Sequence, residues 1–388
     1  MNVRELSEKY QNEIVALRRE FHQNPELSWQ EYNTAARIEK ELNKIGINDT
    51  KRIAGTGVVS SIKGKKGNKV VALRADIDAL LVQEENETFY RSKNDGIMHA
   101  CGHDAHTAML LGAAKVLWEL REQFEGTVKL IFQPAEEVIE GAKKMLEEGV
   151  LEGVDSILAI HVWSELLSGK VSLEEGPRFA AGDRFKIAIK GKGSHGAMPH
   201  MGIDAIVAAS AVVMNLQTIV SREIDPQEPA VISIGKIEGG ENYNVICDSV
   251  MIKGTARSFN LQVQKKFPLL LERIIKHTAS SFNARAELGY MEGALPCIND
   301  PAISKIAKRS ITKLYGNNIV MPCNKTTATE DFSFFLNKIP GVIAFLGTYN
   351  EEKGVIYPHH HNKFNIDEDI LSIGTSLYAQ FAIDFLKK

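Results

Sequence analysis

The chain has 388 residues, a formal net charge of −3 at pH 7, and 44% hydrophobic and 24% charged residues. This length suits about two domains, and the composition is that of a soluble globular protein. Because the net charge is slightly negative and Lys and Arg are scattered along the chain, nothing favours binding to nucleic acid.

The N-terminal segment and the cysteines favour the cytoplasm. Residues 1–27 are charged and amphipathic, without the apolar stretch of a secretion signal. No run of about 18 apolar residues could span a bilayer, so we expect no membrane association. The four cysteines are sparse and widely spaced, unlike a disulfide framework, which predicts a reducing compartment.

In chain order, the first part alternates helical patterns with short apolar runs. Helices are predicted at Glu5–Asn24, Trp29–Leu42 and Ala105–Leu120. Strands are predicted at Gly57–Ile62, Val70–Arg74, Thr127–Phe132 and Ser156–Ile160. Strands that alternate with helices of this length indicate a layered α/β sheet.

The middle of the chain predicts a separate small domain. Strands are expected at Arg184–Lys190, Pro229–Ile237, Val250–Ser258 and Arg285–Met291. Helices are expected between them, at Asp204–Arg222 and Gln262–Phe282. The order β-α-β-β-α-β is that of the ferredoxin-like fold.

After Gly293 the α/β pattern resumes, with predicted elements at Ala302–Tyr315 (helix), Gly341–Gly347 (strand) and Ile366–Leu386 (helix). The predicted fold is therefore α/β: a mixed-sheet domain with helices on both faces, discontinuous over 1–178 and 294–388. A ferredoxin-like α+β domain over 179–293 is inserted in it, as a lid or for dimerisation. Its exposed sheet edges favour a homodimer or homotetramer.

Four segments carry residue types that bind metals or transfer protons. They are Asp76 and Asp78 in VVALRADID, Cys101 and His103 in MHACGHDAH, Glu136 and Glu137 in TVKLIFQPAEE, and His161 in ILAIHVW. In open α/β sheets the functional crevice lies beyond the carboxyl ends of the strands, so these side chains should converge. Thiolate and imidazole suit zinc and similar ions.

The adjacent glutamates favour a division of roles. Two neighbouring carboxylates repel each other unless a cation neutralises one of them. One glutamate would then bind metal while the other accepts a proton. The structural alternative is a helix N-terminus, which favours acidic residues.

The other motifs have structural alternatives as well. Cys101 could be a buried thiol near the start of a helix that is capped by Asp104. His161 could be a packed core residue. His99 and His106 could orient ligands or lie on a helix face. His359, His360 and His361 form a cluster that usually includes a ligand but can be a surface feature. The glycine-rich turn with His195 and the polar loop with Asn244 read as structural when taken alone.

Taken together, the motifs resemble the amidohydrolase branch of the aminoacylase/carboxypeptidase-like dinuclear metallopeptidases. This group includes hippurate hydrolases, N-acyl-amino-acid deacetylases and auxin-conjugate hydrolases. The matching segments, in family order, are LRREFHQNPELSWQE (17–31), GTGVV (55–59), LRADIDAL (73–80), MHACGHDAHTAMLLGAA (98–114), FQPAEE (132–137), AIHVW (159–163), GKGSHGAMPH (191–200), GTARSF (254–259), TEDFSFF (329–335) and HHHNKF (359–364).

The resemblance implies two divalent metal ions per subunit: manganese, zinc, cobalt or nickel. It assigns the metal ligands to Cys101, His103, Glu137, His161 and His360, with Cys101 bridging the ions. It assigns catalytic roles to Glu136 as general base, to Asp76 (with Asp78 as the alternative) as a supporting acid, and to His195, which in related dimers reaches the partner subunit's site. Asn244, Arg257 and Glu330 are expected to bind substrate.

The implied reaction is hydrolysis of the amide bond of N-acyl amino acids by a metal-bound water. Alternatives are a dipeptidase or carboxypeptidase of the same clan and a non-catalytic metal-binding dimer, which the presence of Glu136 disfavours. The chain departs from the family at Leu81, Val138–Glu140, Cys247 and Asn362. These departures remove no expected ligand, and they bear on the shape of the substrate pocket.

Overall fold

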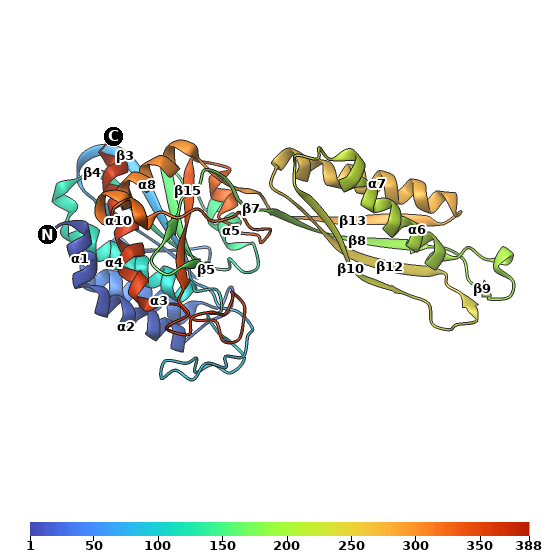
Figure 1. Ribbon diagram of the computed structural model, residues 1–388, viewed down its shortest axis with the longest axis horizontal. Coiled ribbons are helices and arrows are strands. Elements are labelled where there is room, and N and C mark those ends of the chain that lie inside the picture. The colour runs from blue at the N-terminus through green and yellow to red at the C-terminus, as the bar shows by residue number, and fades with distance from the viewer. Residues whose placement is uncertain (388) are drawn as a thin grey trace. The chain divides into compact units, whose positions relative to one another are not determined.

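The computed structural model describes residues 1–387, which form two compact units (Figure 1). The larger unit comprises Met1–Gly176, Ile298–Asn324 and the chain from Asp331 onward. The smaller unit comprises Pro177–Cys297 and Lys325–Glu330. The chain therefore leaves the larger unit, builds the smaller one and returns.

The larger unit is built on a seven-stranded sheet, counted over the described residues, with the order β1-β2-β4-β3-β5-β15-β6. The strands are β1 (Lys51–Ile53), β2 (Gly57–Lys63), β3 (Lys65–Asp76), β4 (Glu125–Gln133), β5 (Ser156–Leu167), β6 (Val171–Ser172) and β15 (Gly341–Tyr349). The central strands β4, β3, β5 and β15 are parallel, and the outer ones are antiparallel. The carboxyl ends of the central strands therefore share one edge of the sheet.

Helices cover both faces of this sheet, as predicted. They are α1 (Val3–Lys9), α2 (Gln11–Gln23), α3 (Tyr32–Ile45), α4 (His103–Glu119), α5 (Gly141–Glu147), α8 (Pro301–Tyr315), α9 (Ser333–Leu336) and α10 (Leu371–Leu386). Leu73 of β3 packs into the core with α4 and α10. Arg74, which points to the opposite face, contacts Asp331 and Phe332 just before α9.

The smaller unit has the ferredoxin-like topology that the sequence predicts. Its strands are β8 (Ala181–Lys190), β10 (Ala230–Gly239), β12 (Ser249–Ser258) and β13 (Arg285–Ala294). They form an antiparallel sheet in the order β10-β12-β8-β13. Helices α6 (Ala205–Thr218) and α7 (Leu261–Ser281) cover one face of it (Figure 1).

Helix α6 is apolar on more than its packed side. By length and composition alone, the helical stretch Ala205–Glu223 could cross a membrane, with a mean hydropathy of 1.4, so the expectation that no stretch is long and apolar enough is wrong. Its residues Ala208, Val212 and Leu216 are buried in the core of the smaller unit, although only 33% of its most apolar 18-residue window is buried. Val207 and Met214 are 48% and 70% exposed, so an apolar side remains uncovered.

Several element boundaries differ from the sequence-based prediction. The helix predicted at Glu5–Asn24 is wrong as a single element, because Tyr10 (φ −93°, ψ 1°) leaves helical geometry between α1 and α2. The helix predicted from Trp29 begins at Tyr32, since Trp29 has φ +67°. The closing helix begins at Leu371 after a short 3₁₀ turn.

The strand predicted to end at Ile160 continues to Leu167, so His161 lies within a strand and does not follow one. Pairing with β15 explains the extension, because Phe345 and Gly347 face His161 and Trp163 in register. Hydrogen bonds to the backbone of β15 thus keep His161 in the strand, although the apolar pattern of the sequence predicts that the strand ends before this polar residue.

Candidate metal centre

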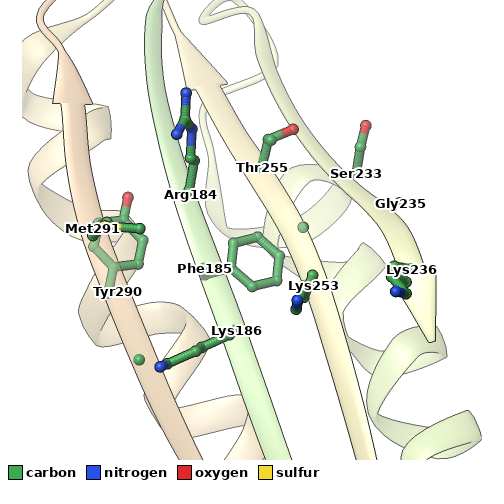
Figure 2. Close-up of a pocket in the computed structure, with 12 residues that line it drawn as sticks. Arg184, Phe185, Lys186, Ser233, Gly235, Lys236, Lys253, Thr255, Tyr290 and Met291 are labelled. Carbon is green, nitrogen blue, oxygen red and sulfur yellow. The ribbon is translucent and has the colours of Figure 1, made fainter. Parts of the chain in front are cut away.

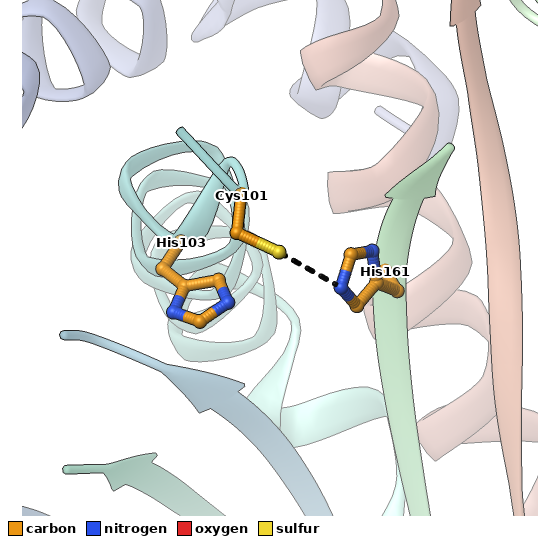
Figure 3. A group of neighbouring side chains, drawn as sticks. All are labelled: Cys101, His103 and His161. Carbon is orange, nitrogen blue, oxygen red and sulfur yellow. Dashed lines mark hydrogen bonds between the residues drawn. The ribbon is translucent and has the colours of Figure 1, made fainter. Parts of the chain in front are cut away.

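The predicted ligands of the larger unit meet at the carboxyl edge of its sheet. Cys101 and His103 lie at the start of α4, and Cys101 Sγ lies 3.6 Å from Nε2 of His161 on β5 (Figure 3). Cys101, His103 and His161 have ligand atoms within 4.8 Å of one another, and so do Cys101, Glu137 and His360. Cys101 belongs to both groups, so its thiolate could serve as a ligand in either.

Hydrogen bonds fix the imidazole rings so that one nitrogen of each faces the cluster. His161 Nδ1 donates to the carbonyl oxygen of Val162 at 2.6 Å, which leaves Nε2 directed at Cys101. His103 Nδ1 donates to Asp78 Oδ1 at 3.2 Å. A carboxylate or carbonyl on the far nitrogen is the usual device that orients a metal-binding histidine.

Two buried ligand atoms have no hydrogen-bond partner among residues 1–387: His103 Nε2 and Glu137 Oε1. They face each other at 3.8 Å, which is too long for a hydrogen bond. Leaving buried polar atoms unpaired costs free energy, so native proteins satisfy them. A divalent cation between imidazole, thiolate and carboxylate would do so, and this donor set fits such an ion.

The histidine cluster contributes one ring to this centre. His360 Nε2 lies 3.7 Å from Glu137 Oε2, and the amide of His360 donates to Ala100 at 2.8 Å. Both ring nitrogens of His359 are already engaged, with Ser164 at 3.0 Å and the carbonyl of Val162 at 2.9 Å. Nδ1 of His361 accepts from the Lys363 amide. His360 is therefore the best-placed ligand of the three.

The buried side chains of this cluster have strongly shifted pKa values. Burial raises the pKa of Glu137 to about 7, despite the opposing effect of His103. Burial alone would lower the pKa of His103, but the nearby Asp76, Asp78 and Glu137 raise it to about 10. Burial lowers the pKa of His161 far below its usual value, so this ring is neutral. The surroundings of His103 therefore favour a positive charge.

Glu136 is held beside the ligands. Its carboxylate lies within 4.8 Å of the ligand atoms of His103 and Glu137, and its Oε1 accepts from the Asp331 amide at 3.3 Å. The Asp331 carboxylate is anchored by Gln133 at 2.7 Å and Arg74 at 3.1 Å. Glu136 is 5% exposed, so its carboxylate is shielded from bulk solvent.

The two aspartates of RADID have different partners. Asp78 accepts from His103, from Ser28 Oγ at 2.7 Å and from the Glu137 amide at 3.0 Å, so it joins three parts of the centre. Asp76 accepts from His106 at 2.5 Å and from Arg74 at 2.7 Å, and lies 3.8 Å from His103 Nε2. Asp78 is thus the carboxylate that orients His103, and Asp76 lies across from it.

The remaining histidines of the MHACGHDAH segment differ in how their ring nitrogens are engaged, and a ligand atom of His106 lies within 4.8 Å of those of His103 and Asp76. His106 is fully engaged, because its Nδ1 bonds Asp76 and its Nε2 accepts from the Val162 amide at 2.9 Å. It therefore fixes Asp76 and β5. Both ring nitrogens of His99 are buried without a hydrogen-bond partner in the described chain, and burial lowers its pKa to about 4.

The four other predicted residues belong to the smaller unit. His195 is exposed on β9 (Ser194–His195), which pairs with β11 (Val245–Ile246), and the Gly196 amide donates to the carbonyl of Asn244 at 2.7 Å. His195 and Asn244 are therefore neighbours. Arg257 donates to the Thr327 carbonyl at 2.6 Å, and Glu330 is buried at the end of the same 325–330 segment.

The smaller unit also carries a groove of about 720 Å³ on its four-stranded sheet (Figure 2). Lys186, Lys253 and Lys236 line it side by side, because they are paired in register on three adjacent strands. This alignment of cations is invisible in the sequence, where the three lysines are far apart. The groove contains none of the predicted catalytic or metal-binding residues.

Several residues that shape the centre have no role predicted from the sequence. Two segments that carry the family resemblance, 17–31 and 329–335, contain Ser28, Glu31 and Asp331. The resemblance therefore includes these residues, but the sequence does not predict their contacts. Arg74 precedes the RADID aspartates and holds Asp76 and Asp331. These contacts join segments far apart in the chain, so only the folded structure reveals them.

An open α/β sheet with thiolate, imidazole and carboxylate groups gathered at its carboxyl edge, and a further carboxylate beside them, defines a metal-dependent hydrolase. Comparison with known sequences gives the family. The chain belongs to peptidase family M20/M25/M40, whose family model matches residues 72–384. The predicted resemblance is thereby confirmed.

The relatives agree in length and fold. The chain is 41% identical to thermostable carboxypeptidase 2 of Saccharolobus solfataricus, over 97% of this chain and 96% of the relative. It is also 41% identical to N-acetyl-L-cysteine deacetylase of Bacillus subtilis, over 92% and 84%. The solved YXEP protein of Bacillus subtilis, a dinuclear metal-binding M20 peptidase, is 34% identical with a TM-score of 0.87, over 98% and 99% of the chains.

Proposed function

We propose that the protein hydrolyses the amide bond of N-acyl amino acids at a centre of two divalent metal ions. The proposed ligands are Cys101, His103, Glu137, His161 and His360. The observation that carries this proposal is the pair of buried, unpartnered atoms His103 Nε2 and Glu137 Oε1, which face each other beside Cys101. Membership of a family of metal-dependent hydrolases supports it.

Bound divalent ions would polarise the amide carbonyl and favour ionisation of a nearby water molecule. Glu136 would accept the proton of that water and deliver it to the departing amine, since its carboxylate is buried and held by the Asp331 amide. Asp78 would keep His103 Nε2 turned toward the centre. His195 would donate to the oxyanion, and Asn244, Arg257 and Glu330 would bind the substrate.

Two substrate classes follow from the relatives. One relative is named as a deacetylase of an N-acetyl amino acid, and another as a carboxypeptidase. Both names imply cleavage of an amide bond, so the same metal chemistry would serve either. We favour N-acyl amino acids because the sequence motifs match the amidohydrolase branch, and we keep peptides as the second candidate.

An elemental analysis combined with a substrate panel tests this proposal. The purified protein should contain divalent metal and should hydrolyse N-acetyl amino acids or benzoylglycine faster than free dipeptides. Treatment with a chelator should abolish the activity, and divalent metal should restore it. Full activity in the metal-free protein would contradict the mechanism, and faster cleavage of dipeptides would select the peptidase alternative.

We also propose that the protein is a homodimer whose subunits meet through the smaller unit. Helix α6 leaves Val207 and Met214 exposed. Strand β10 lies at an edge of its sheet and exposes Val231 and Ile237, which are 41% and 52% accessible. An apolar helix side near an unpaired strand edge is a common site of subunit pairing.

A further inference from the structure

The N-terminal segment that carries the motif LRREFHQNPELSWQE reaches the metal centre at three places. His22 bonds Asp104, next to His103, at 2.7 Å. Ser28 donates to Asp78, the partner of His103, at 2.7 Å. Glu31 accepts from the Ala135 amide, next to Glu136, at 2.9 Å. Nothing in the proposed chemistry accounts for this segment, and the Glu31 contact is closest to the general base.

Glu31 is fully buried and both of its carboxylate oxygens are engaged. Oε1 accepts from the Ala135 amide, and Oε2 accepts from Thr56 Oγ1 at 2.6 Å. Thr56 is itself buried and precedes β2, while Glu31 precedes α3. The carboxylate is therefore fixed on one side by the turn between β1 and β2, and on the other side it holds the turn that follows β4.

That turn, residues 134–141, has an unfavourable backbone. Ala135 has φ +53° and Ile139 has φ +61°, a region that L residues avoid, above all β-branched ones. The turn closes tightly, because the Ala135 carbonyl accepts from the Gly141 amide at 3.1 Å. A Cβ on residue 141 would lie 1.7 Å from the Pro134 oxygen, so only glycine fits there. Glu136 and Glu137 lie between the two left-handed residues.

We propose that Glu31 is a positioning residue that holds Ala135 in its left-handed conformation and thereby aims Glu136 and Glu137 into the centre. The inference rests on the proposed function, since it gives Glu31 its effect through the general base and a metal ligand. The amide of Ala135 is the link: it connects the buried carboxylate to the residue immediately before Glu136. Strain stored beside catalytic groups persists only where surrounding contacts enforce it.

The test begins with Glu31→Ala in the metal-loaded protein. Without the carboxylate that accepts its amide hydrogen bond, Ala135 can relax to a conformation with negative φ. We expect kcat to fall about 10- to 100-fold with little change in KM, because a displacement of about 1 Å is enough to misplace a catalytic group. Two readouts do not depend on turnover. Hydrogen exchange of the residue-135 amide should accelerate, and the affinity of the metal-free protein for Mn²⁺ should weaken because Glu137 shares the turn.

The rescue variant distinguishes positioning from general stability. In the double variant Glu31→Ala/Ala135→Gly, glycine adopts positive φ without steric cost, so the turn no longer depends on the carboxylate. Most of the lost kcat and Mn²⁺ affinity should return. Glu26→Ala is the matched control, because Glu26 lies in the same segment but bonds the Thr34 amide at 2.8 Å at the start of α3. It should lower thermal stability and leave kcat unchanged.

Wild-type kcat, Mn²⁺ affinity and amide exchange in Glu31→Ala would overturn the inference, and so would an equal loss in the double variant. If Glu31→Ala does not fold, Thr56→Val removes the other anchor of Glu31 and should produce the same changes in weaker form. If the wild-type protein cleaves no amide in the panel, the proposed function fails by itself. Mn²⁺ affinity and exchange at residue 135 then still decide the role of Glu31.

Discussion

Glu136 and Glu137 are neighbours in sequence but have different surroundings. Glu137 faces His103 and His360, whereas Glu136 is held by the Asp331 amide. We predict that Glu136→Gln retains bound metal and loses about 10²- to 10⁴-fold in kcat, the range for a lost general base. Elemental analysis and steady-state kinetics check both parts. Glu140→Gln, which changes an exposed carboxylate of the same turn, should have much smaller effects.

The pKa values of the ligands predict how metal affinity depends on pH. In the metal-free protein the pKa of Glu137 is about 7 and that of His103 about 10, so both bind protons at pH 6. A metal ion must displace these protons, and fewer remain on Glu137 at pH 8. We predict that Mn²⁺ binds at least about tenfold more tightly at pH 8 than at pH 6.

Calorimetry in buffers with different ionisation enthalpies should show proton release on binding, and more of it at pH 6. Metal affinity should rise with pH because a raised pKa keeps a proton on the ligand, and this proton competes with the cation. An affinity that does not change between these pH values would mean that Glu137 and His103 are not ligands.

The sequence showed which residue types could form the centre, but not how they are held. Cys101, His103, Glu137 and His161 follow or belong to apolar segments, and the rule that parallel strands share a functional edge predicts that they converge. The contacts of Ser28 with Asp78 and of Glu31 with Ala135 could not be predicted, because they join separate loops whose paths depend on tertiary packing. For the same reason the sequence favoured Asp76, with Asp78 as the alternative, and could not show that Asp78 is the aspartate that bonds His103 Nδ1.

The start of helix α4 carries two predicted ligands and depends on the glycine between them. Gly102 has φ +86°, and a Cβ on it would lie 2.4 Å from Val162, the neighbour of His161. We predict that Gly102→Ala weakens Mn²⁺ binding by at least about tenfold and destabilises the fold by about 2–4 kcal/mol, from backbone strain and overpacking together. Metal titration and thermal unfolding measure the two effects.

Gly153→Ala provides the matched control for backbone strain. Gly153 also has positive φ (+70°), but no atom lies within 4 Å of its added Cβ. The control should cost about 1–2 kcal/mol and leave metal affinity unchanged. An equal loss of Mn²⁺ affinity in both variants would mean that the position of Gly102 beside Val162 is irrelevant.

Helices and strands were predicted better than their boundaries. The alternation of apolar residues indicated the four main strands of the smaller unit and their ferredoxin-like order. The break at Tyr10 and the late start of α3 were missed, because each depends on one residue leaving helical geometry. Strand β5 was predicted too short, since β15 provides hydrogen bonds past the polar His161.

For the whole molecule, the exposed side of α6 predicts the oligomeric state. The substitution Met214→Glu, at a side chain that is 70% exposed, would place a charge in the proposed interface and should convert a dimer to a monomer. Size-exclusion chromatography with light scattering should show this shift. Met291→Glu changes a side chain of similar exposure (64%) on the strand at the opposite edge of the sheet, and should remain dimeric. A monomeric wild-type protein would refute the proposal.

The larger unit is interrupted by the smaller one, and this order has a consequence during synthesis. Cys101 leaves the ribosome long before His360, and α10, which packs against α4, follows later still. A nascent chain therefore carries the Cys101 thiol without the full set of other proposed ligands until translation is nearly finished. Oxidation of that thiol in the interval would produce a full-length chain that never acquires its cofactor. If these residues bind metal as proposed, the complete set of ligands is present only when translation is nearly finished.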